Sequence, residues 1–68
     1  MKKLIRHELN GDFWRATPTT DPKQPRTGFT VAADLSEREL NMLRDTYAKS
    51  DLDGREMIRR MAALSIGR

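Results

Sequence analysis

The chain has 68 residues and a formal net charge of +3, with no cysteine and a single histidine, His7. So short a chain predicts one domain, and the lack of cysteine excludes disulfides, iron–sulfur clusters and thiolate zinc sites. A domain of this size buries only about 60% of its unfolded surface, so a second subunit is an available source of stability. We therefore expect a homodimer, without cofactor or metal.

No apolar run approaches the ~20 residues that a membrane-spanning helix requires. The N-terminal segment has only Leu4 and Ile5 as an apolar stretch, too short for a signal peptide, which predicts a cytoplasmic protein with no membrane partner. The charge is uneven: the first 28 residues carry six basic and three acidic side chains, whereas residues 29–68 carry seven of each. Any attraction to a polyanion therefore lies in the first 28 residues.

Residues 1–17 predict a β-hairpin. Asn10-Gly11 is the turn signal, because both positions accept a positive φ. With that turn, His7 would be a half-exposed strand residue near Trp14. One face would carry Ile5, His7, Leu9, Trp14 and Ala16, and the other Arg6, Glu8, Phe13 and Arg15. Because Phe13 and Trp14 are adjacent in a strand, one ring must point away from the surface on which the other packs.

Residues 18–28 hold all three prolines and predict a loop without regular structure. The loop is long for a compact domain, which marks it as flexible or functional. Residues 29–35 then alternate apolar and other side chains, and this period of two predicts a strand with one buried face.

Two helices are predicted, over residues 36–49 and 53–66. The first opens at Ser36 with a capping box, and a second capping box opens at Asp53. Leu40, Leu43 and Tyr47 form the apolar stripe of the first helix. In the second, the side chains expected to point inward are Met57, Ile58, Met61, Ala62, Leu64 and Ser65. The chain thus predicts an α+β fold in one small domain, residues 1–68: an N-terminal β-hairpin, a long Pro-rich loop, one further strand and two antiparallel α-helices.

The sequence offers no catalytic constellation. His7 is the only side chain that titrates near neutrality, and no serine lies in a nucleophile elbow. The D-L-D-G segment at 51–54 does not fit a calcium loop, because Lys49 and Arg60 would occupy the first and last ligand positions. We therefore expect a non-enzymatic binding protein without a small-molecule substrate.

Residues 29–64 combine a short alternating strand, a capped helix, a short turn and a second helix that contains Glu56-Met57-Ile58-Arg59. This combination resembles the ribbon-helix-helix family of DNA-binding repressors, whose second helix typically carries a Glu-hydrophobic-Ile-Arg segment. The resemblance implies that two chains pair their strands into an antiparallel ribbon that enters the major groove of duplex DNA. Thr30 would then face outward from the ribbon, with Arg55 and Arg59 near a phosphate. A ribbon-helix-helix dimer with an N-terminal extension is thus the alternative to a three-stranded sheet formed within one chain.

Two classes of function follow. The leading hypothesis is a DNA-binding transcriptional regulator, either of ribbon-helix-helix type or one that reads duplex DNA with its sheet. In the second version, the side chains that follow the DNA backbone are Arg6, Arg15, Lys23 and Arg26. The alternative is a phage or mobile-element accessory protein that binds and inhibits a host protein, for example an anti-defence or anti-CRISPR type inhibitor. Phe13 or Trp14 beside Arg15 favours this alternative, because aromatic residues and arginine dominate binding hot spots. The sequence does not distinguish this protein-binding alternative from a third possibility, a structural subunit of a larger assembly.

Overall fold

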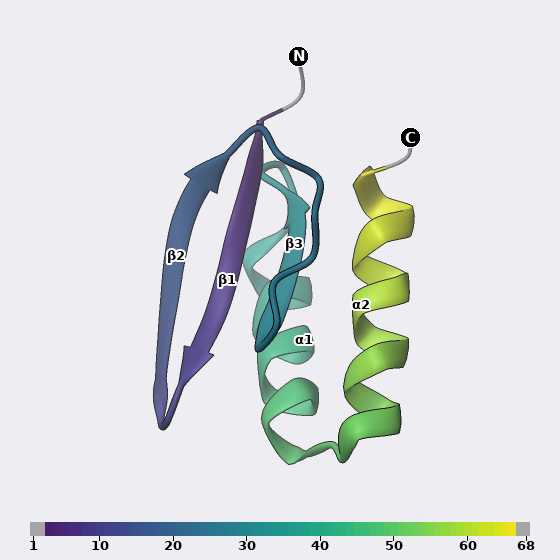
Figure 1. The fold of residues 1–68 in the computed structure, drawn as a ribbon. Coiled ribbons are helices and arrows are strands. Elements are labelled where there is room, and N and C mark those ends of the chain that lie inside the picture. Colours follow the sequence, from purple (N-terminus) through teal and green to yellow (C-terminus); the bar gives the residue numbers. More distant parts are fainter. Residues whose placement is uncertain (1–2, 67–68) are drawn as a thin grey trace.

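A computed structural model describes residues 3–66 and shows three antiparallel strands followed by two helices (Figure 1). The elements are β1 (Leu4–Asn10), β2 (Phe13–Thr19), β3 (Gly28–Ala32), α1 (Glu37–Lys49) and α2 (Leu52–Ile66). The strand order in the sheet is β2-β1-β3, so the N-terminal hairpin pairs with the third strand within one chain. This is the predicted order of elements, although residues 1 and 2 of the predicted hairpin lie outside the described residues.

The turn between β1 and β2 lies one residue later than predicted. Asn10 pairs with Phe13, so Gly11 and Asp12 are the two central residues. Of these only Gly11 has a positive φ, 64°, which is the pattern of a type II′ turn with glycine at its first central position. The pairing register consequently differs by two residues from the predicted one. Because side chains alternate with a period of two, this shift leaves every hairpin side chain on its predicted face.

The structure shortens the predicted loop, residues 18–28, at both ends. β2 runs through Pro18, although the prolines predicted that residues 18–28 would hold no regular structure. Pro18 is tolerated because β2 is an edge strand and the alternation of the ladder turns its backbone nitrogen away from β1. β3 begins at Gly28 and ends at Ala32, three residues before the predicted end. The chain turns after Ala32, because the amide of Leu35 donates back to the carbonyl of Ala32.

The core lies between the helices and one face of the sheet. Its buried side chains are Phe29 and Val31 from β3, Tyr47 from α1, and Ile58 and Ala62 from α2. The two helices run antiparallel, and α2 packs along β3 (Figure 1). None of the helices in residues 3–66 has the length and apolar character needed to cross a membrane.

The predicted N-cap of α1 is confirmed, whereas the predicted N-cap of α2 is wrong. α1 begins as expected, with the hydroxyl of Ser36 accepting from the amide of Glu39 at 3.2 Å. The cap of α2, however, is Asp51, whose carboxylate accepts from the amide of Gly54 at 2.9 Å. Asp53, the predicted cap, lies inside the first turn, where its negative charge still suits the helix dipole.

α2 buries a narrower stripe than predicted. Ile58 and Ala62 are buried, but Met57, Met61 and Leu64 are exposed rather than inward. The apolar side chains of α2 extend around more of its circumference than β3 can cover. The helix therefore presents apolar surface to solvent.

Candidate functional site

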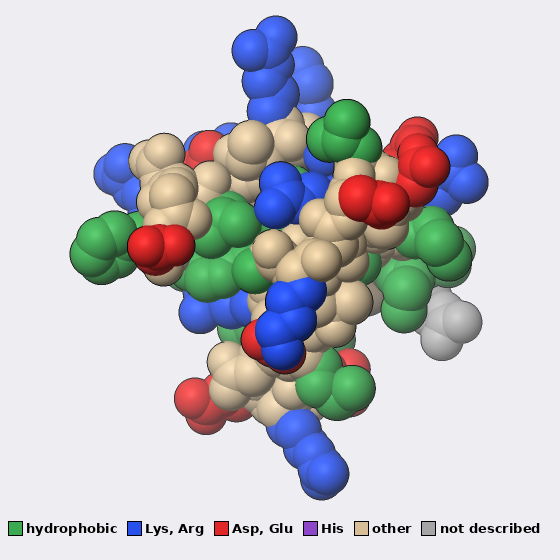
Figure 2. All heavy atoms as spheres, turned by 90° about the horizontal axis from the view of Figure 1, so that it is seen from below, with side chains coloured by type: hydrophobic (Ala, Val, Ile, Leu, Met, Phe, Trp, Pro, Cys, Tyr) green, Lys and Arg blue, Asp and Glu red, His purple; other side chains and the backbone are tan. Residues whose placement is uncertain are grey.

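Hydrophobic side chains reach the surface of this small domain on two separate sides. Seen from the end that holds the hairpin turn, they lie both on the hairpin side and on the α2 side, with lysine and arginine side chains projecting between them (Figure 2). Apart from this view, the helices leave one face of the sheet uncovered and enclose a groove between them. Each is a candidate binding surface.

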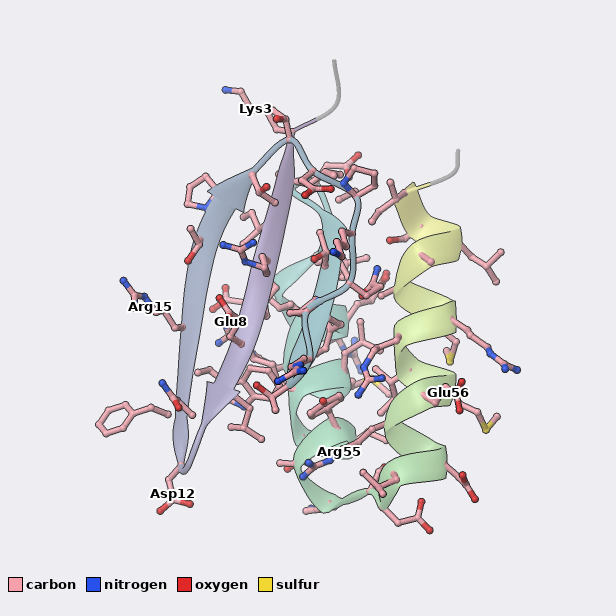
Figure 3. The ribbon with its side chains drawn as sticks, viewed as in Figure 1. Lys3, Glu8, Asp12, Arg15, Arg55 and Glu56 are labelled. Atoms are coloured by element: carbon pink, nitrogen blue, oxygen red, sulfur yellow. The ribbon has the colours of Figure 1, made fainter. Side chains whose placement is uncertain are left out.

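The sheet face turned away from the helices, here called the outer face, carries basic side chains and an exposed aromatic ring. Arg6 and Glu8 of β1 and Phe13 and Arg15 of β2 alternate onto it. Phe13 is 80% exposed. Arg15 lies opposite Glu8 in the ladder and projects away from the sheet, on the far side of the molecule from Glu56 of α2 (Figure 3). The predicted split between Phe13 and Trp14 is confirmed, with Phe13 as the outward ring.

Residues 20–27 run alongside β3 and cover part of the outer face. The side-chain amide of Gln24 accepts from the backbone N–H of Thr30 at 2.9 Å and donates to the carbonyl of Thr30 at 3.2 Å. The hydroxyl of Thr30 donates to the carbonyl of Lys23 at 3.1 Å. Gln24 thus supplies β3 with the pair of hydrogen bonds that a further strand would make. Thr30 is fully buried, which corrects the prediction that it faces a partner.

An open cleft of about 340 Å³ lies between this loop and β1. Arg6, Lys23 and Arg26, three of the predicted contact residues, line it together with Glu8 and Asp21. Arg6 is paired with Glu8 at 3.2 Å, whereas Lys23 and Arg26 are exposed and form no ion pair within residues 3–66. The structure therefore brings these cations to the same side of the molecule as Arg15.

The other predicted contact residues hold the fold together. Trp14 lies on the core side of the sheet, with its ring centroid 5.7 Å from that of Tyr47. Arg55 donates from Nε to the carbonyl of Tyr47 at 3.1 Å and lies over the tyrosine ring. Arg59 donates to the carbonyl of Arg26 at 3.1 Å and so ties α2 to the loop. Trp14 and Arg55 are half-buried and make these packing contacts within the fold.

His7 is buried, with 2% of its surface exposed, which corrects its prediction as a half-exposed residue. Its Nδ1 lies 2.8 Å from Nη2 of Arg44. The guanidinium is always protonated, so Nδ1 accepts and the ring proton sits on Nε2. Burial, and secondarily the charge of Arg44, lower the pKa of His7 from 6.5 to about 4. The neutral imidazole packs inside the fold, and no cluster of metal-ligating side chains occurs in residues 3–66.

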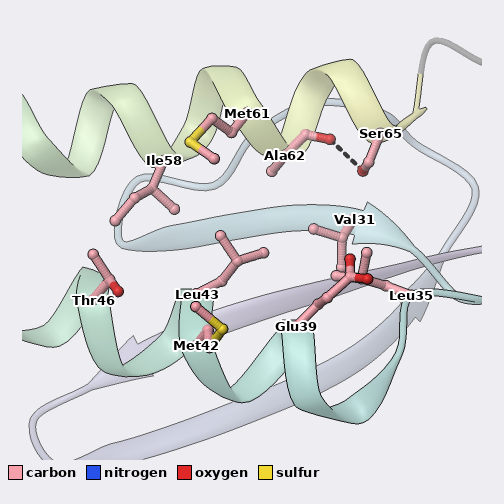
Figure 4. A pocket seen from close by; sticks show the side chains of 10 residues that line it. All are labelled: Val31, Leu35, Glu39, Met42, Leu43, Thr46, Ile58, Met61, Ala62 and Ser65. Carbon is pink, nitrogen blue, oxygen red and sulfur yellow. Dashed lines mark hydrogen bonds between the residues drawn. The ribbon is translucent and has the colours of Figure 1, made fainter.

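The second surface is an apolar groove between α1 and α2, with Val31 of β3 among its lining residues (Figure 4). It has a volume of about 330 Å³. Met42 of α1 and Met61 of α2 line it and remain largely exposed. The only sequence signal for this surface is the helical spacing of the methionines. That spacing did not predict an exposed groove, because methionines at such positions ordinarily fill the core.

The outer face and the groove therefore lie on opposite sides of the sheet and draw on different elements. The outer face is polar, basic and marked by one exposed ring; the groove is apolar and flanked by methionines. Comparison of the chain with protein-family models, with curated proteins and with solved structures finds no match.

Proposed function

We propose that this chain is a non-enzymatic DNA-binding protein that contacts duplex DNA through the outer face. The observation that carries the proposal is the gathering of basic side chains on this side of the molecule, beside the exposed ring of Phe13: Arg6, Arg15, Lys23 and Arg26. Such side chains neutralise phosphates, which supplies most of the sequence-independent affinity for DNA. Residues 29–68, which form both helices, carry as many acids as bases and add no comparable attraction.

The residues of the outer face have distinct tasks in this proposal. Arg15, Lys23 and Arg26 are exposed and reach phosphates, which position the protein without reading sequence. Phe13 offers an apolar contact to a thymine methyl group or to the face of an unstacked base. Glu8 holds Arg6 close to the sheet.

A two-chain ribbon is not required for this mode of binding. β3 is paired with β1, and its outer side at Thr30 is bonded to Gln24, so pairing with a second chain at β3 would first require these bonds to open. The resemblance to ribbon-helix-helix repressors stays a prediction, and so does the role of a transcriptional regulator in the cytoplasm that it implies. The proposal made here depends on the outer face alone.

The experiment is a titration of a fluorescently labelled duplex, followed by anisotropy at several salt concentrations. The three phosphate contacts of Arg15, Lys23 and Arg26 predict that log K falls with log salt with a slope of roughly −3. The double variant Arg15→Ala/Arg26→Ala should weaken binding and make the slope shallower by about 2. The matched control is Arg38→Ala/Arg60→Ala, which removes the same charge from exposed positions on α1 and α2 and should bind like the wild type.

Circular dichroism of each variant establishes that the fold is retained. If the two double variants weaken binding equally, the attraction is to net charge and the outer face is not the contact surface. If the wild-type chain shows no binding at about 50 mM salt, where phosphate contacts are strongest, the proposed function is wrong.

A second candidate function, binding to another protein, is favoured by the neighbourhood of Phe13. An exposed ring with Arg15 on the same face is the composition typical of binding hot spots, and Glu8 and Asp12 dilute the positive charge around it. In that case Phe13→Ala should abolish capture of a protein partner from nuclease-treated extract, while Arg38→Ala/Arg60→Ala retains it. If Phe13→Ala captures the partner as well as Arg38→Ala/Arg60→Ala does, this candidate function is wrong.

A further inference from the structure

We propose that Gln24 is a positioning residue, which holds Lys23 and Arg26 in place for their contacts with DNA phosphates. This inference rests on the proposed function and deepens it, because it accounts for how a loop without helix or strand presents two of the cations. Lys23 and Arg26 lie on either side of Gln24 in the chain, and both line the cleft beside β1. Gln24 is uncharged and half-buried, so its effect on phosphate binding passes through these two neighbours.

Gln24 attaches the loop to the sheet at Thr30. Its side-chain amide bonds both backbone groups of Thr30, at 2.9 and 3.2 Å, and the hydroxyl of Thr30 donates to the carbonyl of Lys23 at 3.1 Å. Thr30 is fully buried in a strand paired with β1, so these bonds end on a firmly held part of the fold. The carbonyl of Arg26 is held separately, by Arg59 of α2 at 3.1 Å. The backbone on both sides of the loop is thereby fixed relative to the outer face.

The hydrogen bonds that precede Gln24 in the chain are local. Oγ1 of Thr19 accepts from the amide of Asp21 at 3.0 Å, and Oδ1 of Asp21 accepts from the amide of Lys23 at 3.0 Å. These bonds shape the turn that leads to Lys23, but they do not join it to β3. Within residues 3–66, the hydrogen bonds that attach Lys23 and Gln24 to β3 all end at Thr30.

A loop that is already fixed binds more tightly, because less order must be created when DNA arrives. Ordering the backbone of a single residue costs enough free energy to weaken an affinity about tenfold. With Gln24 bonded to Thr30, that cost is met when the protein folds. A loop released from β3 would meet it on binding instead. Lys23 and Arg26 would keep their charges, so affinity would fall without any change in net charge.

The experiment is the titration of the labelled duplex with uncharged substitutions. Gln24→Met keeps the length of the side chain and removes both bonds to Thr30. We expect it to weaken binding about tenfold, with the salt slope of the wild type, because no phosphate-binding charge is lost. Thr20→Val is the matched control. It removes a hydroxyl from the same loop that forms no hydrogen bond within residues 3–66, and it should bind like the wild type.

Amide hydrogen exchange, followed by nuclear magnetic resonance, shows whether the loop has been released. The N–H of Thr30 should be protected in the wild type and should exchange faster in Gln24→Met, whereas the amides of α1 should stay protected. This comparison separates release of the loop from loss of the whole fold. Should Gln24→Met fail to fold, Thr30→Val removes only the bond to the carbonyl of Lys23. It is also uncharged, and it should weaken binding by a smaller factor.

Equal affinity of wild type and Gln24→Met would overturn the inference, because a released loop would then bind as well as a fixed one. Unchanged exchange of the Thr30 amide would also overturn it, since Gln24 would not be what fixes the loop. A slope shallower by up to about 2 in Gln24→Met supports it, because the freed cations then no longer reach phosphates. A wild type that binds no duplex defeats the proposed function and this inference with it, whereas the first two outcomes defeat the inference alone.

Discussion

Acidification is expected to destabilise this fold through a single residue, His7. Its imidazole is buried, with its ring centroid 5.4 Å from that of Phe29, and Nδ1 faces the guanidinium of Arg44. Burial first, and Arg44 second, lower its pKa from 6.5 to about 4. In the unfolded chain the ordinary pKa of 6.5 returns. Between the two values only the unfolded chain binds the proton, so stability is complete above pH 6.5 and is lost as the pH falls toward 4.

The magnitude follows from the width of this window. Each pH unit within it lowers the free energy of unfolding by about 1.4 kcal/mol, so the loss is about 2 kcal/mol at pH 5 and approaches about 3 kcal/mol at its lower end. A domain of this size rarely has more than about 3–5 kcal/mol in total. The assay is urea unfolding at about pH 7.5 and about pH 5, followed by the fluorescence of Trp14. His7→Gln, which cannot titrate, is the reference, and subtracting its pH dependence removes the contribution of every other group.

Nuclear magnetic resonance gives the same pKa directly, because the signals of the only histidine are unambiguous. A folded-state pKa near 6.5, or an equal loss of stability in wild type and His7→Gln, would refute the reasoning. Arg44→Met should raise the pKa of His7 only part of the way, because burial is the larger cause. A full return to 6.5 in that variant would show that the charge of Arg44, and not burial, sets the pKa.

Two further predictions concern single side chains, and urea unfolding measures both. Asp51→Ala removes the N-cap of α2 and should cost about 1 kcal/mol, whereas Asp53→Ala should cost only a few tenths. The reverse order would mean that Asp53 caps the helix after all. Tyr47→Phe should leave the free energy of unfolding unchanged or raise it slightly, because the buried hydroxyl of Tyr47 has no hydrogen-bond partner within residues 3–66. A loss above about 1 kcal/mol would reveal a partner that the fold does not display.

The features that depend on local spacing were predictable from the sequence. Ser36 caps α1 because a hydroxyl can reach the amide three residues later, whatever the rest of the fold does. The helix ion pairs Asp45–Lys49 and Glu56–Arg60 likewise follow from a spacing of four residues. The presence of Arg6 and Arg15 on one face also follows from alternation, which survives the two-residue change of register.

The errors arose where two local signals competed or where distant segments decided the outcome. Asp51 and Asp53 are both acceptable caps, and local sequence does not separate them. Nothing near Gln24 indicates that its side chain will bond to β3, so the course of the loop, and with it the position of Lys23 and Arg26 on the outer face, had no sequence signal. The exposure of Met61 depends on how far apart the two helices lie, which their amphipathic patterns do not fix.

The hydrogen bonds of Gln24 also bear on how safely this chain can be concentrated. An exposed strand edge is a template on which other chains add strands, and such addition leads to fibrils. At β3 both backbone groups of Thr30 are already satisfied by one side chain, and at the opposite border of the sheet Pro18 has no donor to offer. Each border of the sheet is therefore blocked at one point, β3 at Thr30 and β2 at Pro18. A strand that adds to either border loses its hydrogen bonds at that point, which hinders growth of one folded molecule on another.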